Sequence, residues 1–301
     1  MSRSFPVLAA VSATVVWGGM FPISAALLAR LDPVQLSAER YAIGAAILLA
    51  ILAWREGAGA LRADGNGRLI AALGLAGFTG FNVLLLCGVR LAGPQHGALF
   101  MAMVPAFSVI VGALRTRVAP SPQRIPFIFA ALAGVVTVVC ARGGVHSASV
   151  LGDVMLLAAV LCWVVYTQGA GELRGWSPLR FTALSAAAGA VGLVLLAAAG
   201  ALTGISPLPS LDDYAATAPG MAYMVALGAV FSVVAWTVAV RGLGPQRAAL
   251  FGNLVPVVTF TVTIVMGTHP LPLEIAGTLL TLGALAGDNL AGTRALVART
   301  A

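Results

Sequence analysis

Long apolar runs occupy most of the 301-residue chain and leave short polar connections between them. An α-helix rises about 1.5 Å per residue, so about 20 apolar residues cross the roughly 30 Å hydrocarbon core of a membrane. Charged residues make up 9% of the chain, whereas a soluble domain carries about 25%. We therefore predict an all-α integral membrane protein with ten transmembrane helices. The predicted helices cover residues 5–28, 34–54, 69–89, 95–114, 124–141, 151–171, 178–200, 219–241, 246–267 and 272–291.

Short polar motifs mark where several of these helices begin. Asp32-Pro33 and Ser177-Pro178 each combine a polar capping residue with a first-turn proline. The longest expected connection covers residues 201–218. The first run could be read as a signal peptide, but it is long enough to span and lacks a clear cleavage site, so we predict a retained helix.

One segment of the chain occurs twice. Residues 89–105 read VRLAGPQHGALFMAMVP and residues 240–256 read VRGLGPQRAALFGNLVP, with ten of seventeen positions identical at a constant offset of 151. Such an internal echo indicates two copies of one structural unit. Each copy has a Gly-Pro turn and then a proline inside an apolar run, Pro105 or Pro256. We expect these prolines to kink their helices and to act as hinges that gate a cavity.

The duplication also predicts topology. We divide the chain into a first five-helix repeat, 1–146, and a second, 147–301. Because five is an odd number, the second repeat enters the membrane in the opposite orientation to the first. Inverted repeats of this kind are typical of secondary transporters, which bind their substrate between the halves and work by alternating access.

The basic residues, all of them arginine, give the orientation. With the N-terminus in the cytoplasm, thirteen of the seventeen arginines fall on the inner side. The four on or near the outer side are Arg30, Arg40, Arg90 and Arg142. The positive-inside rule therefore predicts that both termini are cytoplasmic. The formal net charge of +7 then reflects membrane topology, so we expect no nucleic-acid partner.

The chain offers no recognisable catalytic chemistry. We find no catalytic set, no phosphate-binding glycine loop, and no spacing of its three cysteines and three histidines that would hold a metal. We therefore expect no enzyme activity, no cofactor and no ATP hydrolysis. The carboxylates fall mostly in loops or first helical turns, and none lies clearly at mid-membrane. This placement favours facilitated diffusion or exchange over a proton relay.

Polar and aromatic side chains near the middle of the predicted helices are the candidate substrate-binding residues. They would form a mostly apolar pocket with a few hydrogen-bonding groups, which suits an amphipathic solute. The alternative is that the aromatic rings merely fill the bundle. An asparagine side chain that faces lipid is costly, so Asn82 and Asn253 should face the interior under either interpretation. The candidates are Trp17, Tyr41, Asn82, Trp163, Tyr166, Trp236 and Asn253.

Arg40 is a separate candidate because it lies about 10 Å inside the second helix, counted from Pro33. In one interpretation it binds a substrate carboxylate. In the other it extends to the membrane surface or pairs with Asp32. Glycines at close spacing, among them Gly74, Gly77 and Gly189, predict tightly packed helix pairs.

The repeated motifs resemble a known family. The residues that carry the resemblance are Trp17-Gly18, Trp163-x-x-Tyr166, the two Gly-Pro turns, the two Ala-Leu-Phe segments and the two helix prolines. Over residues 5–291 the chain resembles the EamA-type branch of the drug/metabolite transporter superfamily, and within it the bacterial exporters of aromatic amino acids. Proteins of the EamA type often place a glutamate at the turn before the last helix of each repeat. In this chain residues 116–124, before the fifth helix, contain no glutamate, and the second half offers only Glu274.

The resemblance implies a secondary transporter of a bacterial inner membrane that exports aromatic and other hydrophobic amino acids. Export of drugs or other small metabolites by the same fold is the alternative, and a non-transporting membrane scaffold is the alternative from another class. Strongly anionic substrates would need several basic residues in the cavity, and only Arg40 is available. The expected partners are a small-molecule substrate and membrane lipid, with no evident protein partner.

Overall fold

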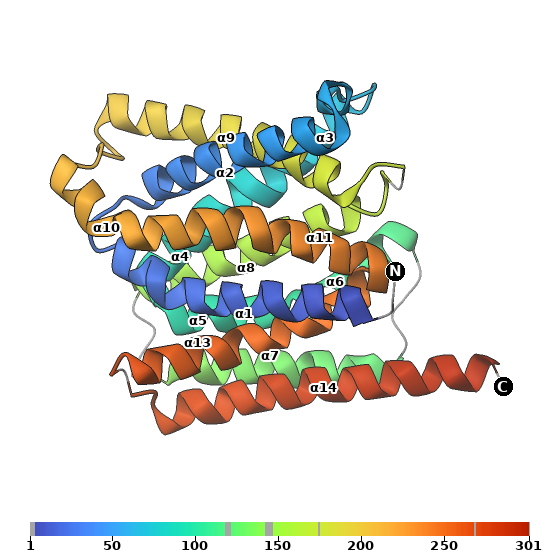
Figure 1. Cartoon of the computed structure of the whole chain (residues 1–301). Coiled ribbons are helices and arrows are strands. Elements are labelled where there is room, and N and C mark those ends of the chain that lie inside the picture. The colour runs from blue at the N-terminus through green and yellow to red at the C-terminus, as the bar shows by residue number, and fades with distance from the viewer. Residues whose placement is uncertain (1–3, 118–121, 142–146, 174, 268, 301) are drawn as a thin grey trace.

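The computed structural model describes residues 4–117, 122–141, 147–173, 175–267 and 269–300, and every regular element among them is helical (Figure 1). Arg3, Arg142 and Arg174, which entered the charge count, lie outside these residues. The elements are α1 Ser4–Leu27, α2 Pro33–Glu56, η1 Ala58–Leu61, α3 Gly67–Gly74, η2 Leu75–Gly80, α4 Phe81–Ala92, α5 Pro94–Ala102, α6 Val104–Thr116, η3 Pro122–Arg124, α7 Ile125–Cys140, α8 Ser147–Gly169, α9 Pro178–Thr203, α10 Leu211–Tyr223, η4 Met224–Phe231, α11 Ser232–Leu243, α12 Pro245–Ala249, η5 Leu250–Asn253, α13 Leu254–Val265 and α14 Pro272–Thr300.

Most of the chain forms helices that are long enough to cross a membrane. Among the described residues, seven helical stretches are long and apolar enough to cross a membrane. An eighth is added if the bent pair α5 and α6 forms one span, and two shorter apolar helices cover 125–138 and 272–284. Each of these segments overlaps one of the predicted runs. The prediction of an all-α, multi-pass membrane protein is confirmed.

The helices run roughly side by side along one direction (Figure 1). Helix α2 packs against α9 on one side of the bundle, and α7 packs against α14 on the opposite side. Between these pairs, α4 packs against α8, and α1 packs against both α11 and α13. The first and last described residues lie at the same end of the bundle (Figure 1). The core is therefore built between helices far apart in sequence.

The predicted capping residues begin their helices. The Asp32 side chain accepts a hydrogen bond from the backbone N–H of Val34, and Ser177 accepts one from the backbone N–H of Arg180. Each satisfies a backbone donor that the first helical turn would otherwise leave free.

The expected loop at 201–218 is wrong in extent. Helix α9 continues to Thr203, and α10 begins at Leu211. The early start of α10 has a local cause, because Ser210 and Asp213 form a capping box in which each side chain accepts a hydrogen bond from the other's backbone N–H. The acidic residues assigned to the loop thus lie in a helical first turn, where the helix dipole favours negative charge.

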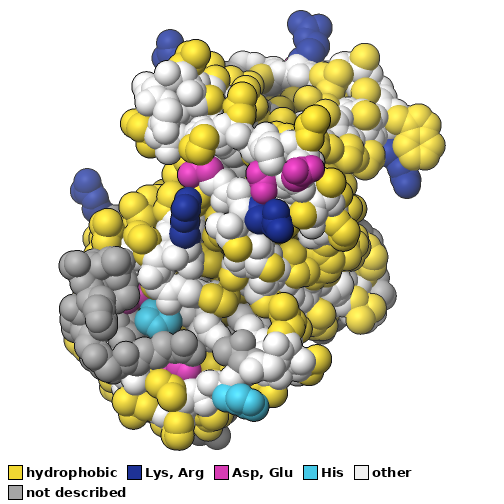
Figure 2. Space-filling view, turned by 90° about the vertical axis from the view of Figure 1, so that its left-hand side faces the viewer, with side chains coloured by type: hydrophobic (Ala, Val, Ile, Leu, Met, Phe, Trp, Pro, Cys, Tyr) yellow, Lys and Arg dark blue, Asp and Glu magenta, His cyan; other side chains and the backbone are white. Residues whose placement is uncertain are grey.

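Apolar side chains cover the outward faces of the bundle. Val191, Leu195 and Leu202 of α9 are all exposed, as is Phe129 of α7. At the end of the bundle opposite the described chain ends, Figure 2 shows a yellow periphery and a cluster of acidic and basic side chains nearer the centre. This distribution suits lipid around the sides and water at the ends.

Close glycine contacts join α9 to η2. A Cβ atom placed on Gly189 would lie 2.4 Å from the Cβ of Phe78 and 2.5 Å from the carbonyl oxygen of Gly74. Both distances are shorter than side chains allow, so this helix pair packs through its glycines, as predicted.

Gly189→Ala should therefore destabilise the folded protein by about 1–3 kcal/mol, the usual cost of overpacking. The matched control is Gly283→Ala on α14, because a Cβ there meets nothing within 4 Å. Thermal unfolding in detergent should show a lower midpoint for the Gly189 variant alone. Equal midpoints for the two variants would contradict this packing.

Candidate functional site

A cavity lies among helices from both halves of the chain. It is lined by Trp17, Met20, Phe21, Ser24, Arg40, Tyr41, Phe81, Asn82, Leu85, Leu86, Met101, Trp163, Met224, Val233 and Val255. Its volume is about 40 Å³, which is room for about three water molecules. An amino acid is larger, so the lining must move apart before one can enter.

Five of the eight candidate substrate-binding residues line this cavity. They are Trp17, Arg40, Tyr41, Asn82 and Trp163. Tyr166 and Trp236 are not among the lining residues but are buried against Trp163. Asn253, at the end of η5, is half-buried and also does not line the cavity. Its side-chain oxygen is buried and has no hydrogen-bond partner among the described residues.

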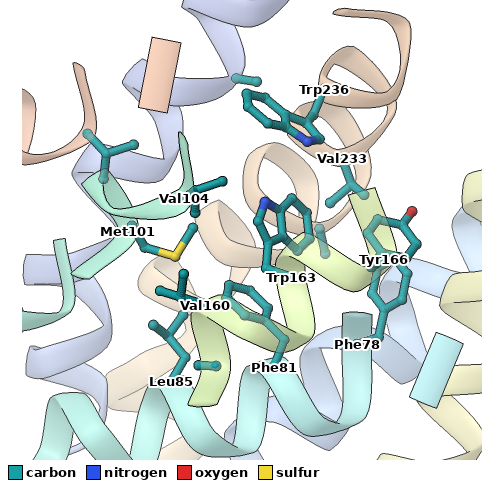
Figure 3. Close-up of a cluster of buried hydrophobic side chains, with 14 of the residues drawn as sticks. Phe78, Phe81, Leu85, Met101, Val104, Val160, Trp163, Tyr166, Val233 and Trp236 are labelled. Carbon is teal, nitrogen blue, oxygen red and sulfur yellow. The ribbon is translucent and has the colours of Figure 1, made fainter. Parts of the chain in front are cut away.

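Aromatic rings form one wall of the cavity. Trp163 of α8 lies at the centre, with its ring centroid 5.3 Å from that of Trp17 and 4.9 Å from that of Phe81. Trp17 also meets Trp236 at 5.3 Å. Figure 3 shows Phe81, Tyr166 and Trp236 around the Trp163 ring. Edge-on and tilted ring pairs of this kind hold each ring in one orientation.

A second layer of rings supports this wall. Tyr166 packs against Phe78, with 5.1 Å between centroids, and stacks on Phe181 at 5.4 Å. Gly77 makes room for it, because a Cβ at that position would lie 2.4 Å from Cγ of Tyr166. The wall is therefore held rigidly from behind by residues of three different helices.

Arg40 is the only charged side chain among the residues that line the cavity. It is 2% exposed, which excludes its extension to the membrane surface. It does not pair with Asp32, whose carboxylate contacts Arg90 at 3.5 Å and the hydroxyl of Ser206. Instead, Nη2 of Arg40 donates a hydrogen bond to Oδ1 of Asn82.

The Arg40 guanidinium remains only partly satisfied. Its Nε and Nη1 atoms are buried and have no hydrogen-bond partner among the described residues. The guanidinium lies near the ring of the adjacent Tyr41, 4.4 Å from the centroid, which offers a cation–π contact but no negative charge. A buried cation without an anion is costly, and this cost is usually met only where function requires it.

Asn82 holds the arginine in place. Its Nδ2 donates a 2.7 Å hydrogen bond to the carbonyl of Phe78 one turn earlier, which turns Oδ1 towards Arg40. Both residues are candidates from the sequence alone, but no local pattern pairs them, because they lie 42 positions apart on different helices. Phe81 also lines the cavity but was not predicted, since an apolar aromatic residue beside Asn82 looks the same in the sequence whether it packs or lines a cavity.

The two proline-containing helices are broken at equivalent places. Helices α5 and α6 meet at Met103 with a bend of 45°, two residues before Pro105. In the second half, η5 interrupts the helix three residues before Pro256. The two breaks are neighbours, because a Cβ on Gly252 would lie 3.7 Å from the carbonyl oxygen of Met101.

Within the described residues, no group of three or more His, Cys, Asp or Glu side chains could hold a metal ion. His146 lies outside those residues. What the fold and cavity define is a multi-pass membrane protein with an aromatic-walled cavity that contains one buried cation.

Comparison with known proteins identifies the family. The sequence profile of the EamA-like transporter family matches residues 4–140 and again residues 150–287. The chain therefore belongs to the EamA-like transporter family, as the resemblance of its repeated motifs indicated. Its members are transporters.

Individual relatives cover nearly the whole chain. It is 28% identical to the uncharacterized transporter YrdR of Bacillus subtilis, over 94% of this chain and 90% of the relative. It is also 28% identical to a probable terminal-alkyne amino-acid exporter of Streptantibioticus cattleyicolor, over 98% of this chain and 96% of the relative. A solved crystal structure matches with a TM-score of 0.68 at 22% identity, over 96% of this chain and 98% of that chain. At this identity the likeness shows the fold alone.

Proposed function

We propose that the chain forms ten transmembrane helices in two inverted five-helix repeats, residues 1–146 and 147–301. In this arrangement α4 corresponds to α11, and α8 corresponds to α1. Helix packing supports it, because α4 packs against α8 and the equivalent helices α11 and α1 also pack together. The same correspondence relates the π-helical segments η2 and η4. The turn glycines also agree, with φ and ψ of 97° and 164° at Gly93 and 85° and 153° at Gly244.

This transporter, we propose, exports aromatic and other hydrophobic amino acids from the cytoplasm across a bacterial inner membrane. The observation that carries the proposal is the partly satisfied guanidinium of Arg40 on an otherwise uncharged, aromatic cavity wall. A carboxylate would supply the missing charge and accept hydrogen bonds from Nε and Nη1. The rings of Trp17 and Trp163 would then meet an apolar or aromatic side chain.

A single buried cation favours a substrate with one carboxylate. A phosphate ester or nucleotide sugar carries more negative charge than Arg40 can balance in a desolvated cavity. The exporter among the relatives carries, by its name, an amino acid with an apolar terminal alkyne. That name agrees with a carboxylate at one end of the substrate and an apolar group at the other.

We also propose that both termini are cytoplasmic and that transport proceeds by facilitated diffusion or exchange. Helices α2, α6 and α11 end near Arg55, Arg115 and Arg241 at the end of the bundle where the described chain ends lie (Figure 1). This accumulation of arginine supports a cytoplasmic assignment for that end. We call the opposite end the outer end.

Transport can be tested with the purified protein in liposomes. Vesicles loaded with labelled phenylalanine should release it faster than protein-free vesicles, and unlabelled leucine or tryptophan outside should accelerate release by exchange. An unlabelled nucleotide sugar should have no effect. Failure to move any amino acid, with release of a hydrophobic drug instead, would favour the alternative substrate class.

The helix breaks should act as hinges. In Pro105→Ala the new N–H can donate to the Met101 carbonyl and join α5 to α6, and in Pro256→Ala the same bond can form to Gly252. We expect both variants to fold and to unfold at the wild-type temperature or above, while amino-acid exchange falls several-fold. Wild-type exchange in both variants would show that the breaks are not hinges.

A further inference from the structure

A buried ion-pairing contact joins the two halves near the outer end. His96, on the first turn of α5, and Asp153, on the second turn of α8, are 5% and 8% exposed. Nδ1 of His96 lies 2.9 Å from Oδ1 of Asp153. From the sequence, most carboxylates were expected in loops or first helical turns, whereas Asp153 lies in the second turn of α8 and is buried.

Tight helix packing is the reason that this pair is buried. A Cβ on Gly88 of α4 would lie 2.9 Å from the carbonyl oxygen of Gly152, and a Cβ on Gly152 would lie 3.0 Å from Cβ of Ala92. The backbones of α4 and α8 therefore touch beside Asp153. Oδ2 of Asp153 is buried and has no hydrogen-bond partner among the described residues.

Among the side chains that the structure describes, the other charged groups on the surrounding helices are engaged elsewhere or exposed. Arg90 of α4 contacts Asp32, Arg115 of α6 contacts Glu172 and Glu274 of α14 accepts from the backbone N–H of Leu271. Arg68 of α3 is exposed. The described segments α1, α13, η2 and η5 contain no charged residue. Other titratable groups are also described on α5, on α8 or on the helices in contact with them. They are the Cys87 and Cys162 thiols and the Tyr166 phenol.

The charge of the pair decides how well it tolerates burial. With neutral histidine and ionised aspartate the pair carries one net negative charge. One added proton makes it neutral, whether the proton resides on the imidazole or on the carboxyl group. Burial without water penalises the charged form much more than the neutral form. The closed packing of α5 against α8 should therefore be more stable when the pair holds the extra proton.

We propose that His96 and Asp153 form a proton-binding site that must be occupied for the outer end of the transporter to close. The proton comes from the outer solution when the two helices are apart and is retained when they pack together. The inference rests on the proposed transport function, because outer closure is one step of alternating access. It adds a proton as a ligand of the gate and requires no proton to cross the membrane with the substrate.

Exchange of phenylalanine in liposomes, at equal pH inside and outside, tests this step. Between about pH 8.5 and 5.5, acidification should raise the wild-type exchange rate. We expect at least about a tenfold rise, because the protonated fraction of one site changes about tenfold per pH unit above its midpoint. Asp153→Asn keeps the shape of the side chain but removes its charge, so the pair is neutral without an added proton and its rate should not rise on acidification.

Two further variants complete the comparison. His96→Gln leaves a buried carboxylate that still needs a proton but removes the imidazole that shares it, so the rise in rate should move to more acidic pH. Asp212→Asn changes an exposed acid in the first turn of α10, at the same end of the bundle, and should keep the wild-type response. A wild type that exchanges substrate at a pH-independent rate, or an Asp153→Asn variant that keeps the full response, would overturn the proposal.

A second measurement does not depend on the substrate. Hydrogen–deuterium exchange of residues 89–103 and 150–157, corrected for the intrinsic effect of pH, should become slower in the wild type on acidification. In Asp153→Asn it should already be slow at the alkaline end of this range and should not become slower on acidification. Absence of amino-acid exchange at every pH, with this protection pattern present, would reject the proposed substrate class but keep the gate. Protection that is independent of pH in the wild type would reject the gate.

Discussion

Arg40→Gln is expected to remove most amino-acid transport without lowering the thermal stability of the protein. Hydrogen bonds to charged groups contribute about 1.5–3 kcal/mol, so loss of the guanidinium should weaken binding of the substrate carboxylate by about ten- to 150-fold. Stability should not fall, because the variant also loses a buried charge that the described residues leave without an anion. A residue kept for stability would show the opposite pattern.

Two measurements on the same preparations check this result. Exchange of labelled phenylalanine in liposomes gives the change in transport, and unfolding in detergent gives the change in stability. Arg30→Gln is the matched control, because Arg30 is exposed and pairs with Asp213 at 3.4 Å outside the cavity. It should behave as wild type in both assays. An Arg40 variant that unfolds early, or one that exchanges at the wild-type rate, would show that Arg40 is not a substrate-binding residue.

Trp163→Ala should impair both stability and transport. The ring is buried and contacts Trp17, Phe81, Tyr166 and Trp236. Truncation of a buried aromatic side chain costs about 3–5 kcal/mol because a void remains where the ring packed. The cavity would also lose the wall on which an apolar substrate side chain rests.

Trp163→Phe separates these two effects, since it keeps a ring for packing but reduces the stacking surface. We expect it to recover most of the unfolding midpoint while phenylalanine exchange remains below wild type. Trp54→Ala is the control, because that ring is 79% exposed at the end of α2 and should contribute little to either property. A Trp163→Phe variant with wild-type exchange of every aromatic amino acid would mean that this ring only packs.

Much of the secondary structure could be predicted because the membrane imposes a simple rule. An apolar run must become a helix, since lipid offers no hydrogen-bond partner to its backbone. The caps at Asp32 and Ser177 and the glycine packing at Gly189 are likewise local signals. The extent of the loop at 201–218 was wrong although the signal is local there too, because the capping box of Ser210 and Asp213 begins a helix inside the stretch that was read as a loop.

The type of side chain at the candidate site was predictable from the sequence, but which of these side chains line the cavity was less so. Polar and aromatic residues at mid-membrane are costly in lipid, so Trp17, Asn82 and Trp163 could be named from composition and position alone. Whether such a residue lines a cavity or stands behind it depends on helix rotation. Tyr166 and Trp236 pack against Trp163 without lining the cavity, and no periodicity in a uniformly apolar helix indicates that in advance.

The sequence by itself determined that this chain is an all-helical, multi-pass membrane protein of a transporter family, because apolar length and repeated motifs are properties of neighbouring residues. Only the tertiary structure decided which groups meet. Among the described residues, Arg40 contacts Asn82 and no carboxylate, and His96 contacts Asp153 across the two halves. These contacts join positions 42 and 57 residues apart. They depend on how helices rotate and pack against one another, which no local pattern encodes.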